Sequence, residues 1–148
     1  MLVLSVVAIV ASLFAPAAAT PQRSTRNTPE ARVYVFTAPA AGAETEEDKG
    51  RQDAAGDVRE ALRGKRHLTL VDTREAADVV VEVIGREERD LGEGGFGGKS
   101  LTKFRETIVR VRVTSKDRSS DLKGIGKGSW KSAAKDLAAR LQKWIERG

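Results

Sequence analysis

Apolar and polar residues follow each other along this chain in patterns that predict four strands and two helices. Apolar residues at every second position indicate a strand with one buried face, and apolar residues three or four positions apart indicate a helix with one buried face. By these rules the strands span 32–37, 67–72, 78–86 and 103–115, and the helices span 44–63 and 129–147. The segment 116–128, rich in glycine, lysine and serine, is predicted to be a connection.

The most regular strand pattern is the last one. Val109, Val111 and Val113 alternate with Arg110 and Arg112. Strict alternation of this kind is typical of a strand that buries one face in the core and exposes the other to water.

The final helix has the stronger apolar stripe of the two. Trp130 and Trp144 are fourteen residues apart on it, close to four helical turns, so both are expected in the core. Ser129 is placed to cap its first turn, and Gly64 is placed to end the earlier helix.

The element order β-α-β-β-β-α predicts an α+β fold. The expected architecture is a two-layer sandwich, with both amphipathic helices on one face of a four-stranded mixed sheet. Together with the Ala-Asp-Val-Val-Val-Glu-Val run at 77–83, this order resembles small bacterial envelope domains, namely the amino-terminal domain of TolB and the CsgG family of curli secretion. The resemblance implies the fold alone, because no functional motif of those families matches.

The amino-terminal pattern predicts an export signal. Residues 2–14 are apolar and uncharged, and Ala17 and Ala19 occupy the −3 and −1 positions of a signal-peptidase site before Thr20. An apolar core of about 13 residues is too short to cross a bilayer of about 30 Å. Because no Lys or Arg precedes this core, an uncleaved inner-membrane anchor through 2–19 is the alternative.

This pattern divides the chain into three parts. We expect a signal peptide at 1–19, a disordered spacer rich in Pro, Thr and Arg at 20–31, and a single α+β domain at 32–148. An exported domain of this kind resides in the periplasm or outside the cell.

Composition narrows the chemistry. The chain has no cysteine, which excludes disulfides, a lipid-modified cysteine and thiolate metal sites. Its net charge of +5 is unevenly spread along the sequence. Residues 20–98 contain 12 Lys/Arg and 16 Asp/Glu, whereas residues 99–148 contain 14 Lys/Arg and 5 Asp/Glu. The two halves either neutralise each other across one sheet or leave a basic surface for an anionic partner.

The sheet's second face is the candidate binding surface. If the alternating valines at 79, 81, 83, 109, 111 and 113 face the helices, the opposite face is mixed apolar and charged, as protein interfaces are. Its predicted members are Tyr34, Phe36, Val80, Glu82, Ile84, Ile108, Arg110 and Arg112. A lysine in place of Ile108 is expected to abolish association and leave folding intact. Phe96, in a glycine-rich connection at 87–102, is a candidate loop tip for contact with a partner or a bilayer.

No catalytic, cofactor or metal site is predicted. The run at 92–100, Gly-Glu-Gly-Gly-Phe-Gly-Gly-Lys-Ser, ends like a phosphate-binding loop but has Glu93 where that loop requires glycine. The carboxylates Glu87, Glu88, Asp90 and Glu93 are interpreted as solvated loop charges, because their spacing does not match an EF-hand.

Nucleic acid and nucleotides are not expected partners. The basic ribbon of Lys103, Arg105, Arg110 and Arg112 has the charge for nucleic acid, but an exported protein rarely meets nucleic acid or ATP. A lone His67 without a matching serine or cysteine motif predicts neither a catalytic triad nor a zinc site.

The predicted function is that of a non-enzymatic binding or assembly domain of the bacterial cell envelope. The expected partner is an envelope protein, with self-association into a homo-oligomer as a further expectation. The alternatives are a basic surface binder of anionic envelope polymers or lipids, and a small hydrolase-type enzyme.

We predict that the exported protein begins at Thr20, because the signal-peptidase site ends at Ala19. Mass spectrometry of the chain recovered from the envelope fraction measures this directly. A chain that retains Met1 contradicts cleavage and favours the anchor.

Overall fold

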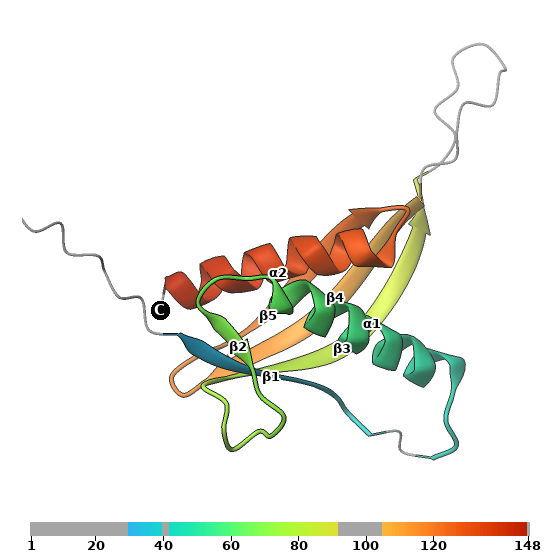
Figure 1. Cartoon of the computed structure of the whole chain (residues 1–148). Helices are drawn as coiled ribbons and strands as arrows, with labels where there is room; N and C mark the ends of the chain where they lie inside the picture. Colours follow the sequence, from blue (N-terminus) through green and yellow to red (C-terminus); the bar gives the residue numbers. More distant parts are fainter. Residues whose placement is uncertain (1–29, 40–41, 92–104, 148) are drawn as a thin grey trace, which may run out of the picture.

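The computed structural model describes residues 30–39, 42–91 and 105–147 (Figure 1). They form five strands and two helices in the order β1, α1, β2, β3, β4, β5, α2. Their bounds are β1 Ala31–Thr37, α1 Glu46–Arg63, β2 Leu68–Leu70, β3 Val79–Asp90, β4 Arg105–Ser115, β5 Ser119–Lys127 and α2 Trp130–Glu146. The predicted signal peptide and nearly all of the spacer lie outside these residues.

The strands form one mixed sheet in the order β2-β1-β3-β4-β5. β1 is parallel to β2 and β3, whereas β4 is antiparallel to both of its neighbours, β3 and β5. The α+β class and the two helices agree with the prediction, but the sheet has five strands instead of four. The additional strand is β5, where the sequence analysis placed a connection.

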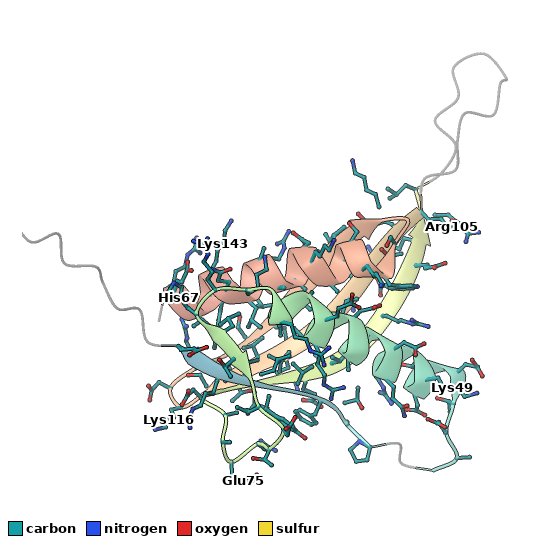
Figure 2. The ribbon with its side chains drawn as sticks, in the orientation of Figure 1. Lys49, His67, Glu75, Arg105, Lys116 and Lys143 are labelled. Atoms are coloured by element: carbon teal, nitrogen blue, oxygen red, sulfur yellow. The ribbon has the colours of Figure 1, made fainter. Side chains whose placement is uncertain are left out.

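The core lies between this sheet and the two helices, which pack side by side on one face of it (Figure 1). The six alternating valines of β3 and β4 that were predicted to face the helices are all buried, which confirms that part of the pattern. Figure 2 shows the side chains on both layers, with Arg105 and Lys116 labelled at the two ends of β4.

Two glycines let α2 approach β5 closely. A Cβ atom added at Gly124 would lie 2.2 Å from the Ala133 carbonyl oxygen, and one added at Gly126 would lie 2.5 Å from the Ala133 nitrogen. These glycines occupy inward-facing positions of β5 at which a strand usually has apolar side chains. Because they have no side chain, the sequence of β5 lacks the alternation that predicts a strand.

The start of α2 is stabilised by backbone hydrogen bonds to the Ser129 carbonyl oxygen and by the Thr107 hydroxyl. The buried Thr107 hydroxyl lies 3.1 Å from the Gly126 carbonyl oxygen and 2.9 Å from that of Ser129. The predicted cap by the Ser129 side chain is wrong, because that side chain makes no capping hydrogen bond. Gly128, at φ 66°, makes the turn from β5 into the helix.

Both tryptophans pack at the margin of the core and are only partly buried. The guanidinium of Arg86 lies 4.7 Å from the Trp130 ring centre, and that of Arg118 lies 3.7 Å from the Trp144 ring centre. The expected packing of both tryptophans against the core is confirmed, and each ring also has an arginine over it.

The first helix begins at Glu46 instead of at Glu44, and Thr45 and Asp48 form a capping box at its start. The Thr45 hydroxyl accepts from the Asp48 N–H, and the Asp48 carboxylate accepts from the Thr45 N–H. The helix ends before Gly64, at φ −90°, so this glycine is not in the left-handed conformation; His67, at φ 64°, makes the turn into β2.

An ion pair ties β1 to the start of β3. The Arg32 guanidinium donates to both carboxylate oxygens of Asp78, at 3.0 and 2.9 Å, and the Arg32 N–H donates to the same carboxylate at 3.0 Å. These side-chain and backbone hydrogen bonds lower the pKa of Asp78 to about 2. The pair supports the register of the two parallel strands.

We predict opposite stability changes for two glycine-to-alanine substitutions. Gly124→Ala should lower the free energy of unfolding by about 3 kcal/mol, because the new methyl group overlaps the backbone of α2. Gly56→Ala, on the exposed side of α1 with no atom near the new Cβ, should raise it by about 0.5–1 kcal/mol. Urea unfolding measures both, and equal effects would contradict the close packing.

Candidate binding surface

Among the described residues, neither helix covers the second face of the sheet (Figure 1). We use the name outer face for the central part of this surface, whose residues are given at the end of this paragraph. Strand register brings its residues into rows that run across the sheet, one of which is Phe36, Glu82, Arg112 and Asp121. The outer face consists of Tyr34, Phe36, Val80, Glu82, Ile84, Glu87, Ile108, Arg110, Arg112, Thr114, Ser119, Asp121, Lys123 and Ile125.

One side of the outer face is aromatic. The rings of Tyr34 and Phe36 are stacked, with centres 5.7 Å apart and planes 10° apart. The guanidinium of Arg74, from the turn before β3, lies 5.9 Å from the Phe36 ring centre. Both rings are partly exposed, so they offer a rigid apolar platform with a cation beside it.

The other side is charged, and its arginines have carboxylate partners. Arg112 donates to Asp121 at 3.1 Å, and Arg110 lies 3.0 Å from Glu87. The hydrogen bond from Arg112 to Asp121, with the charge of that carboxylate, raises the pKa of Arg112. Both pairs are exposed, so each contributes little to stability.

β3, which lies between the two sides, contains a β-bulge. The register of β3 against β4 shifts between Val83 and Gly85, which leaves Ile84 without a partner residue. Ile84 is 37% exposed and lines a shallow hollow of about 420 Å³ with Arg110, Arg112 and Lys123. Lys123 was missed by sequence analysis because β5 was interpreted as a connection.

Ile108 differs from the other predicted members of this surface. It is only 3% exposed, although it lies outside the main core cluster. Its cross-strand neighbours are Glu87 and Ile125. This burial argues against the expectation that a lysine at position 108 leaves folding intact.

Three of the four acidic residues that the sequence pattern places in a loop, Glu87, Glu88 and Asp90, belong to β3, which continues to Asp90 instead of ending at residue 86. Glu87 pairs with Arg89 and Arg110, and Glu88 and Asp90 lie 3.8 and 3.5 Å from Arg105. Successive residues of a strand point to opposite faces, so Glu88 and Asp90 lie on one face of β3 and Glu87 on the other, and the three carboxylates do not converge on one point.

No group of three or more His, Asp or Glu side chains within the described ranges could hold a metal ion. Glu93, Phe96 and the glycine-rich run at 92–100 lie outside those ranges. The same part of the chain contains no helix long and apolar enough to span a membrane.

A second hollow, of about 350 Å³, lies between the helices and is lined by charged residues. Its polar members are Asp57, Glu60, Lys65, Lys131 and Lys135. Glu60 and Lys131, 3.6 Å apart, have 64% and 68% of their side-chain surface exposed. Water therefore reaches these groups freely, unlike the groups of a closed active site.

No family model matches this chain, and no curated protein matches it. Three solved structures are similar at low identity. Rare lipoprotein B from Shewanella oneidensis is 11% identical, with 78% of this chain and 94% of that chain covered and a TM-score of 0.46. An uncharacterized lipoprotein B from Nitrosomonas europaea is 14% identical, with 80% and 79% covered and a TM-score of 0.37.

The third structure is a PelC dodecamer from Paraburkholderia phytofirmans. It is 17% identical, with 80% of this chain and 87% of that chain covered and a TM-score of 0.42. These values assign the chain to no family and to no function.

We predict that two isoleucine-to-lysine substitutions on this surface differ in their effect on the free energy of unfolding. Ile108→Lys should lower the free energy of unfolding by about 3 kcal/mol, because it places a charge at a buried position. Ile84→Lys should change it by less than about 1 kcal/mol, since Ile84 is exposed at the bulge. Thermal and urea unfolding of both variants check this; equal losses would contradict the difference in burial.

Proposed function

We propose that this chain is a non-enzymatic binding domain whose outer face docks onto a partner protein of the bacterial envelope. The observation that carries the proposal is the outer face itself, where a stacked aromatic pair, an exposed isoleucine and exposed ion pairs lie on one rigid sheet. Aromatic residues and arginines are the side chains most enriched at protein interfaces.

The charge balance of the outer face supports a protein partner over an anionic polymer or lipid. Its cations are Arg110, Arg112 and Lys123, and its anions are Glu82, Glu87 and Asp121. A surface that binds polyanions generally carries an excess of Lys and Arg. This face has equal numbers of both signs, so it complements a partner face of mixed charge.

The absence of catalytic activity is part of the proposal. The charged hollow between the helices supports it, because its exposed Glu60 and Lys131 are solvated and pair with each other. An acid–base catalyst generally needs a titratable group whose pKa is tuned by a water-excluding site. The envelope setting rests on the predicted export signal.

The test is site-specific photo-crosslinking of the full chain in intact bacterial cells. A photoreactive residue in place of Ile84 should crosslink to one envelope protein, whereas the same residue in place of Gly56, on the exposed side of α1, should not. The adduct should disappear when Arg112→Glu is added, because the substitution reverses a charge at the centre of the face.

Salt distinguishes the two partner classes. After extraction, association through an apolar platform should persist at about 0.5 M NaCl, where exposed charge interactions are largely screened. Loss of association at that salt concentration favours an anionic polymer or lipid. Equal crosslinking from positions 84 and 56 contradicts the outer face as the binding surface.

A further inference from the structure

The free edge of β5 is a second surface with distinct chemistry. Among the residues that the structure describes, β5 is the last strand of the sheet and pairs only with β4. Gly128 donates its N–H to the Arg105 carbonyl at 2.8 Å, so the even-numbered residues of β5 direct their backbone groups to β4. The odd-numbered residues therefore direct theirs away from the sheet.

One of these outward groups is already occupied. The Ile125 N–H donates to the Asp136 carboxylate of α2 at 3.0 Å, and Arg140 donates to the same oxygen at 2.8 Å. Burial raises the pKa of Asp136, but these hydrogen bonds outweigh it and the net pKa is lowered. Within the described part of the chain, the N–H groups of Asp121 and Lys123 have no such partner.

An unpaired strand edge is a template for another strand. Two copies of β5 that pair in antiparallel fashion about a two-fold axis must bond through the backbone groups that point away from β4. These groups belong to the odd-numbered residues, so each odd-numbered residue must lie opposite an odd-numbered residue of the other copy. This requirement limits the axis to positions centred on one residue of the strand.

Charge and occupancy select among the four central positions, Asp121 to Gly124. An axis at Asp121 or at Lys123 places two like charges directly opposite each other, which is unfavourable. An axis at Gly124 makes the Ile125 N–H part of the central ladder, where Asp136 already holds it. An axis at Leu122 places Asp121 of each copy opposite Lys123 of the other, with four free backbone N–H groups between them.

We propose that two copies of this chain associate through β5, antiparallel about an axis at Leu122, to form one continuous ten-stranded sheet. Leu122 of one copy then faces Leu122 of the other on the helix side, and two Asp121–Lys123 pairs form on the opposite side. Asp136 of each copy ends the intermolecular ladder at Ile125. This proposal concerns the edge of the sheet and does not rest on the proposed use of the outer face.

Cysteine crosslinking tests the axis, because the native chain has no cysteine. Across the axis, the two Leu122 residues form a non-hydrogen-bonded pair with Cα atoms about 4.5 Å apart, a separation that a disulfide spans. In the full-length chain, Leu122→Cys should give a covalent dimer on a nonreducing gel after mild oxidation with copper phenanthroline. Ser120→Cys is the matched control, since it faces Gly124 of the other copy.

The outcomes are distinct. A dimer from Leu122→Cys, none from Ser120→Cys, and a wild-type chain that sediments as a dimer support the proposal. Equal crosslinking of both variants overturns the register. A folded Leu122→Cys chain that does not crosslink, or a wild-type chain that is monomeric up to millimolar concentration, overturns the dimer. Circular dichroism of each variant verifies folding.

Charge exchange provides a second, independent measurement. Lys123→Asp places carboxylates opposite each other at both pairs and should raise the dimer dissociation constant about tenfold. Combining Lys123→Asp with Asp121→Lys restores opposite charges and should recover most of that loss. Failure of the combined variant to recover it, with folding intact, contradicts the predicted pairing.

Discussion

The close approach of α2 to β5 is the constraint on which the rest of the structure depends. With no side chain at Gly124 or Gly126, the helix backbone rests directly on the strand backbone, and the Thr107 hydroxyl bridges the junction. This contact positions α2 over β5 and β4, and leaves β1, β2 and β3 to be covered by α1. Both helices then lie on one face, and neither of them covers the other face.

The same contact shapes the free edge of the sheet. Because α2 lies so near β5, Asp136 reaches the Ile125 N–H and occupies one of the groups that another strand would use. The contact between α2 and β5 therefore affects both the outer face and the β5 edge. They differ in chemistry: the face offers aromatic rings and exposed ion pairs, whereas the edge offers the outward-directed backbone groups of Asp121 and Lys123.

The alternation of apolar and polar side chains predicts the buried face correctly in β3 and β4, but the prediction is wrong where glycine or a bulge interrupts the alternation. The valines of β3 and β4 were assigned to the correct face because each inward position carries an apolar side chain. In β5, glycines occupy the inward positions next to α2, so the period of two was not visible. The bulge at Ile84 has no distinctive signal of its own, and the charged end of β3 was mistaken for a loop because its Arg partners are on another strand.

By itself, the sequence determined the α+β class, the two helices, the buried valines and most residues of the outer face, since all of these follow from local periodicity. Only the tertiary structure decided that β5 is a strand, that Ile108 is buried, and that each tryptophan lies between the core and an arginine. The physical reason is that these properties belong to contacts between elements. A glycine is a close-packing site, and an isoleucine is buried, only when a neighbour from elsewhere in the chain covers it.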